Sequence, residues 1–137
     1  MSQLKAKSEL NRAAADILQD KSYYPSVVHC AYYSCIQRIK YILLSKYNLT
    51  EADLLQERTA LSSTTSKPLG LHEYLINKIT KELLKNKKDW KSFNTDILQL
   101  KKLRVNSDYE DVQIDFSKGK TSIDLSDSVL KGLIKNF

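Results

Sequence analysis

The pattern of apolar positions predicts one long central helix. The segment Pro25–Lys46 contains no lysine, arginine, aspartate or glutamate before Arg38. Its apolar residues recur at alternating spacings of four and three, at Val28, Tyr32, Cys35, Ile39 and Ile42. This spacing is typical of a helix that packs nearly parallel or antiparallel to its neighbours. Pro25 fits the first helical turn, where the N–H that proline lacks would have no partner.

The same period predicts four further long helices. We place them at about residues 2–19, 71–85, 91–107 and 123–136. Each has an expected core face. These faces are, in the same order, Leu10, Ala14, Ile17 and Leu18 in the first helix; Leu75, Ile76, Ile79 and Leu83 in the second; Phe93, Ile97 and Leu100 in the third; and Val129, Leu130, Leu133 and Ile134 in the last. A short extra helix is expected after Thr50, with Asp53 completing a capping box. The fold class is therefore all-α: an up-and-down helical bundle of about five helices.

The connections contain few helix breakers. Three glycines and two prolines in 137 residues favour long helices over a sheet with many turns, in one domain over residues 1–137. The clearest loop is Ser62–Gly70, which is rich in hydroxyl groups and includes Pro68. The alternation of Val112, Ile114 and Phe116 predicts a short extended segment before the last helix.

Composition and the cysteines point to a soluble, cytoplasmic protein. The longest strongly apolar run, Tyr41–Leu44, is far too short to span a membrane, and the first residues contain no signal-peptide core. Cys30 and Cys35 would lie about 140° apart around their helix, so they cannot bridge each other. We expect two buried free thiols. The chain contains no CxxC, HExxH or glycine-rich phosphate loop, and we predict no metal and no cofactor.

Positive charge is concentrated in one half of the chain. Of the net charge of +6, the range 71–104 contributes nine basic residues against four acidic ones, and Lys78–Lys102 holds most of them. Such a surface can meet the phosphates of a nucleic acid. A solvated helix surface is the alternative, and lysine without interleaved arginine or aromatic residues favours it.

One polar pair interrupts an apolar stripe. Arg104 and Asp108 are four residues apart on the face that continues Phe93, Ile97 and Leu100. An arginine against apolar surface needs a partner, and Asp108 is the nearest one. The pair is interpreted in two ways: as an ion pair that fixes the geometry of the bundle or a dimer, or as part of a cleft that binds a phosphate or nucleotide.

The helix order, the segment with Tyr24, Val28 and Cys30–Cys35, and the Leu-Arg-x-x-x-Asp-Tyr ending at Leu103–Tyr109 resemble a HEPN domain (higher eukaryotes and prokaryotes nucleotide-binding). The resemblance extends from Leu4 to Ile134. It implies a helical bundle that forms a homodimer. Many members of this family are metal-independent RNases, often toxins paired with a nucleotidyltransferase-type antitoxin or components of antiviral defence.

The chain departs from the family at the RNase site. Family RNases place a histidine shortly after the arginine, and the two copies face each other across the dimer. Arg104 matches the arginine, but Tyr109, Glu110 and Asp111 occupy the positions of the histidine. An ionised Asp108 accepts a proton but does not readily donate one.

We therefore predict a module that is non-catalytic or weakly active and binds a partner protein, a nucleotide or RNA. One alternative is an RNase toxin that uses Arg104 with Asp108 or His72, and another is a nucleic-acid-binding protein that acts through its lysines. The predicted ligand-binding residues are Tyr33, Arg104, Asn106, Asp108 and Tyr109.

The aromatic residues and histidines near these positions leave several interpretations open. Tyr109 loosely matches a tyrosine that the partner modifies in some family toxins. Tyr32 is expected in the core, whereas Tyr33 is assigned neither to the core nor to base stacking. His29 and His72 reach Arg104 only if folding or dimerisation brings them there, and such histidines are more often capping or core-edge residues.

Overall fold

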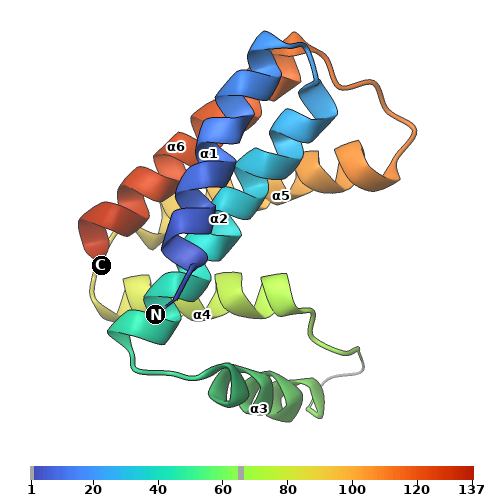
Figure 1. The fold of residues 1–137 in the computed structure, drawn as a ribbon. Coiled ribbons are helices and arrows are strands. Elements are labelled where there is room, and N and C mark those ends of the chain that lie inside the picture. The colour runs from blue at the N-terminus through green and yellow to red at the C-terminus, as the bar shows by residue number, and fades with distance from the viewer. Residues whose placement is uncertain (1, 65–66) are drawn as a thin grey trace.

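The computed structural model describes residues 2–64 and 67–137, which form helices and no strand (Figure 1). The helices are α1 (Leu4–Asp20), α2 (Tyr24–Lys46), α3 (Glu51–Ser62), α4 (Leu71–Lys85), α5 (Trp90–Tyr109) and α6 (Phe116–Asn136). The prediction of an all-α bundle is confirmed. The described residues contain six helices rather than about five, because the short helix after Thr50 extends over 12 residues.

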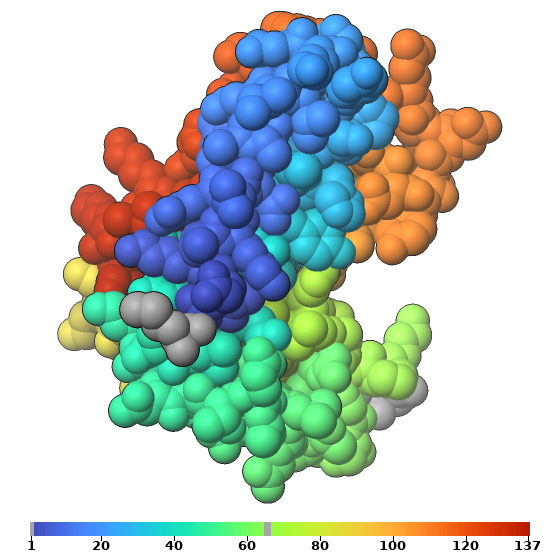
Figure 2. All heavy atoms as spheres, in the orientation of Figure 1, coloured from blue at the N-terminus to red at the C-terminus, as the bar shows by residue number. Residues whose placement is uncertain are grey.

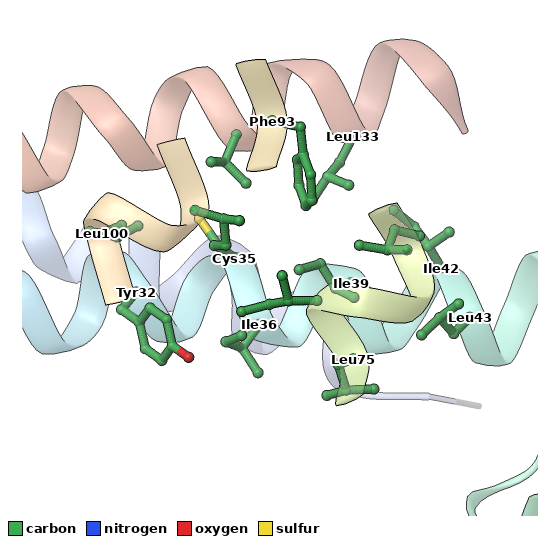
Figure 3. Packing of buried hydrophobic residues seen from close by; sticks show 14 of the residues in the cluster. Tyr32, Cys35, Ile36, Ile39, Ile42, Leu43, Leu75, Phe93, Leu100 and Leu133 are labelled. Carbon is green, nitrogen blue, oxygen red and sulfur yellow. The ribbon is translucent and has the colours of Figure 1, made fainter. Parts of the chain in front are cut away.

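Helix α2 is the centre of the bundle and packs against α1, α4, α5 and α6. The predicted seam of α2 is confirmed, since Val28, Tyr32, Cys35, Ile39 and Ile42 are all buried. Figure 3 shows Cys35, Ile36 and Ile39 facing side chains of the surrounding helices, which include Leu75, Phe93, Leu100 and Leu133. The predicted core faces of α4 and α5 are buried as well.

The predicted core face of α1 is wrong in part. Leu10 and Ile17 are 70% and 59% exposed, whereas Ser8 and Ala15 are buried. The hydroxyl of Ser8 donates a hydrogen bond of 2.6 Å to the backbone oxygen of Ser34 on α2. The two helices therefore approach each other through small residues, and Leu10 and Ile17 point outward.

Residues 112–115 lie outside any helix and Asp115 has extended backbone angles, as predicted, but the start of the last helix is misplaced. The last helix begins at Phe116 rather than at about Ile123, because the carboxylate of Asp115 accepts a hydrogen bond from the backbone N–H of Lys118 at 2.9 Å. This N-cap satisfies a donor of the first helical turn that would otherwise be unpaired.

At the other end of α6, Val129 and Leu133 are buried as predicted, but Ile134 is 59% exposed.

Helix α3 lies at the edge of the bundle, next to α4 (Figure 1). Its predicted capping box is present: the Thr50 hydroxyl accepts from the Asp53 N–H, and the Asp53 carboxylate accepts from the Thr50 N–H. Leu54 anchors the helix to the core, and Glu57 binds Lys78 of α4. In the predicted loop Ser62–Gly70, α3 ends at Ser62, and residues 65 and 66 lie outside the described part.

The thiols differ in burial. Cys35 is buried, and burial raises its pKa to about 12. Cys30 is only half-buried, so the prediction of two buried thiols holds for one of them. Within the described ranges, no helix is both long and apolar enough to cross a bilayer.

Candidate functional site

Arg104 lies among aromatic rings where α5 meets α2. Its side chain is 14% exposed, and the carbon at the centre of its guanidinium lies 5.5 Å from the ring centre of Tyr32, 5.6 Å from that of Tyr33 and 5.3 Å from that of Tyr109. Nη2 donates a hydrogen bond of 3.0 Å to the Tyr33 hydroxyl. Contacts of this kind between a cation and aromatic faces are attractive and restrict the orientation of the guanidinium.

Asp108 stands one helical turn after Arg104 and forms an ion pair with it. Its Oδ2 lies 3.1 Å from Nε of Arg104, and the Asp108 side chain is 24% exposed. The Nε–H does not point at this oxygen well enough for a hydrogen bond, so this buried donor has no hydrogen-bond acceptor among the described residues. The predicted ion pair is present, and it leaves part of the hydrogen-bonding capacity of Arg104 unused.

His29 approaches the same carboxylate from the start of α2. Its Nδ1 lies 3.4 Å from Oδ2 of Asp108, and its side chain is 49% exposed. The imidazole also lies against the ring of Tyr33, with 4.5 Å between the ring centres. Asp108 therefore lies between a guanidinium and an imidazole. His29 was not among the predicted site residues.

His72, at the start of α4, contacts Tyr32 and Tyr33 on the buried side of the site. Its Nδ1 lies 3.1 Å from the Tyr32 hydroxyl, and its ring centre lies 5.4 Å from that of Tyr33. Burial, followed by the charges of Arg104 and Lys101, lowers the pKa of His72 below its ordinary value of 6.5. Burial also raises the pKa of Tyr32. The tautomer of the neutral His72 decides which of the two groups, Nδ1 or the Tyr32 hydroxyl, donates this hydrogen bond.

The fold brings together most of the predicted site residues. We refer to the following residues as the Arg104 cluster: His29, Tyr32, Tyr33, His72, Arg104, Asp108 and Tyr109. Tyr109 is 71% exposed and forms the outer edge of the cluster. Asn106 is the exception. Two residues after Arg104, it points about 200° away around the helix, and it makes no side-chain hydrogen bond within the described residues.

The cluster combines side chains from α2, α4 and α5. Glu110 and Asp111, which occupy family positions for the histidine, are exposed. The histidines come instead from α2 and α4. The sequence leaves the position of His29 relative to Arg104 open, because nothing near His29 in the chain indicates that the end of α5 packs there.

The lysine-rich surface is a weaker candidate. Lys78 is held by both carboxylate oxygens of Glu57, at 2.8 Å and 3.0 Å, and Lys91 lies over the ring of Trp90. Lys101 is the lysine whose charge acts on His72, so it extends the positive potential of Arg104. Within residues 2–64 and 67–137, no group of three or more histidine, cysteine or carboxylate side chains is arranged to hold a metal ion.

The geometry supports two kinds of chemistry. A guanidinium fixed on aromatic rings can bind a phosphate, and exposed rings such as Tyr109 can stack on a base. An imidazole oriented by a carboxylate can transfer protons near neutral pH. In comparisons with known proteins, no family model, no curated protein and no solved structure matches this chain.

Proposed function

We propose that this chain is a HEPN-like module that binds the phosphate of an RNA or nucleotide at the Arg104 cluster. It acts as a homodimer, with a partner protein such as a nucleotidyltransferase-type antitoxin, in a toxin–antitoxin or defence context. The observation that carries the proposal is the position of Arg104, whose guanidinium lies against three tyrosine rings at the junction of α2 and α5. The resemblance of Tyr24–Cys35 and Leu103–Tyr109 to the family supports the same proposal.

The charges around Arg104 support an anionic ligand of small size. Asp108 offsets part of the positive charge, while Lys101 adds to it. A phosphate that approaches the cluster meets Arg104 and the exposed imidazole of His29 together. The ring of Tyr109 lies at the outer edge, where the base of the same nucleotide can stack on it.

Metal-independent RNA cleavage is the second candidate, and the contact between His29 and Asp108 favours it. In this reaction, the 2′-oxygen attacks the phosphorus, and the bond from phosphorus to the 5′-oxygen breaks. His29, oriented by Asp108, accepts the proton of the 2′-hydroxyl, and water protonates the leaving oxygen. Arg104 stabilises the negative charge that develops on the phosphoryl oxygens. His29 thus takes the place of the histidine that is absent after Arg104.

Titration of a labelled RNA pool with purified protein, without metal, tests both candidates. The variant Arg104→Ala is compared with Lys102→Ala, which removes an exposed cation from the same helix. The proposal predicts that Arg104→Ala weakens binding by about tenfold or more, as expected when a charged hydrogen-bonding group is lost. Equal losses of RNA affinity in both variants, together with an affinity that falls steeply as salt is added, would instead indicate binding through the lysine-rich surface.

A further inference from the structure

The connection between α4 and α5 meets the end of α6 at one end of the bundle. A hollow of about 240 Å³ lies between them, and its lining includes Asp89 and Ser92 on one side and Lys131 and Lys135 on the other. Figure 2 shows the yellow atoms of the connection beside the red atoms at the end of α6. The start of α5 is therefore about 20 Å along the helix axis from the Arg104 cluster at its other end.

Six exposed lysines lie on the segments that meet here. We refer to them as the lysine end: Lys85, Lys87, Lys88, Lys91, Lys131 and Lys135. None of them forms an ion pair within the described residues. The positive charge of this end therefore faces solvent.

The carboxylates near the lysine end have other partners or none. Asp89 accepts a hydrogen bond from the backbone N–H of Ser92, and Asp96 accepts one from the hydroxyl of Ser128. Glu9 lines a neighbouring groove together with Lys131 and Lys135, but it forms no ion pair with either. The lysines outnumber these acids, so an anion that approaches this end meets a net positive charge.

Lys87 occupies a position that glycine usually takes. Its φ is 57°, in the left-handed region. The N–H of Lys87 donates to the backbone oxygen of Leu84 at 3.0 Å, and the N–H of Lys88 donates to that of Leu83 at 2.9 Å. These two hydrogen bonds form a Schellman motif, whose left-handed residue is usually glycine because a side chain there costs free energy. The stability of the turn therefore does not explain a lysine at this position.

Lys91 opposes the dipole of its own helix. Helix α5 has Asp89 as its N-cap but no acidic residue in its first turn, where Lys91 lies. The N-terminal end of a helix carries partial positive charge, which disfavours a cation there. Lys85 and Lys135 differ, because they lie in the last turns of α4 and α6, where a cation is favourable. Helix dipoles thus explain two of the six lysines and oppose a third.

We propose that the lysine end binds the backbone phosphates of the same RNA strand that occupies the Arg104 cluster. This inference rests on the proposed function and narrows its ligand to an RNA strand rather than a free nucleotide. Lysine ammonium groups bind phosphates as point charges and do not read bases, so the lysine end adds affinity without sequence preference. At about 3.4 Å per phosphate, a strand needs about six nucleotides to extend between the two sites.

The affinity for single-stranded RNA of two lengths, about 4 and about 16 nucleotides, tests the lysine end. Wild type is compared with Lys91→Gln/Lys131→Gln and with the control Lys21→Gln/Lys120→Gln, which removes two lysines at the opposite ends of α1 and α6. In about 0.1 M salt, Lys91→Gln/Lys131→Gln should bind the longer RNA about tenfold or more weakly than wild type. The slope of log K against log salt should become shallower by about 1.4, because two phosphate contacts are lost. Affinity for the shorter RNA should not change.

Three results would overturn the proposal. The first is wild-type affinity of Lys91→Gln/Lys131→Gln for the longer RNA, and the second is an equal loss in the control. The third is binding of wild type to vesicles of anionic lipid that this variant loses while it keeps its RNA affinity, which would assign the lysine end to a membrane surface. Undiminished binding of the shorter RNA by Arg104→Ala would instead contradict the proposed function, so the two failures are distinguishable.

Substitution of Lys87 provides a second measurement that separates charge from fold. Lys87→Gly and Lys87→Gln both remove the ammonium group, and both should weaken binding of the longer RNA to the same extent. Only Lys87→Gly should raise the midpoint of urea denaturation, because glycine adopts a positive φ without steric cost. Wild-type affinity of both variants for the longer RNA would overturn the assignment of Lys87 to the phosphate-binding surface.

Discussion

His29 and Asp108 are 79 residues apart in the chain, yet Nδ1 of His29 lies 3.4 Å from Oδ2 of Asp108. The same oxygen lies 3.1 Å from Nε of Arg104. A single carboxylate therefore holds both an imidazole and a guanidinium at the junction of α2 and α5. Two functional possibilities, phosphate binding and proton transfer, depend on this junction.

If the protein cleaves RNA, His29 transfers the proton. Replacement of His29 by alanine should then lower the metal-free cleavage rate by about 10²- to 10⁴-fold, the usual contribution of a general acid or base. RNA affinity should change much less, because Arg104 remains in place. Single-turnover rates and binding isotherms of the same variant separate the two effects. His72→Gln is the matched control, and a larger loss of rate in that variant would assign the proton transfer to His72.

The hydroxyl of Tyr33 fixes the orientation of Arg104. Tyr33→Phe removes the acceptor of the 3.0 Å hydrogen bond from Nη2, and the free energy of unfolding should fall by about 0.5–1.5 kcal/mol. Urea denaturation measures this change. Tyr23→Phe is the control, because its 58% exposed side chain should contribute little. Equal stabilities for the two variants would show that the hydrogen bond contributes nothing to the folded state.

The depressed pKa of His72 should make stability depend on pH. Because burial, Arg104 and Lys101 lower the pKa of His72 in the folded state, the unfolded chain binds more protons just below pH 6.5. The free energy of unfolding contributed by this residue should therefore decrease as the pH falls below about 6.5. Thermal unfolding at a series of pH values between 5 and 8 should show a smaller acid-side loss for His72→Gln than for wild type. Parallel curves for the two proteins would contradict this role of His72.

The close packing of α1 on α2 makes Ala15 intolerant of larger side chains. Ala15→Leu inserts volume into a fully buried position and should destabilise the protein by about 1–3 kcal/mol. Ala6→Leu, at an exposed position of the same helix, should change stability by less than about 0.5 kcal/mol. Chemical denaturation of both variants measures the difference. Similar effects at the two positions would show that α1 packs loosely.

The sequence predicts the helices better than it predicts which face of α1 is buried. The seam from Val28 to Ile42 is correct, because a long central helix must bury its apolar stripe against several neighbours. On α1, hydrophobicity alone selects Leu10 and Ile17, but close packing against α2 selects Ser8 and Ala15. A pattern of apolar residues does not by itself show which face of a helix packs against its neighbours.

The candidate site is predictable only where its residues lie close together in the chain. Arg104 and Asp108 share one helix, and their spacing alone predicts the ion pair. His29 reaches that pair only because the end of α5 packs against the start of α2, where Ser107 also donates a hydrogen bond to the backbone oxygen of Pro25. The error in the start of the last helix is local instead, since Asp115 is a recognisable N-cap for a helix that begins at Phe116.

Phosphate binding at the Arg104 cluster is tested by the affinity of wild type and Arg104→Ala for a labelled RNA pool in the absence of metal. Unfolding curves of both proteins are needed alongside, so that a loss of binding is not a loss of fold. A folded Arg104→Ala should bind RNA about tenfold or more weakly than wild type, while Lys102→Ala should bind like wild type. Undiminished binding by Arg104→Ala would contradict the claim that the Arg104 cluster is the phosphate site.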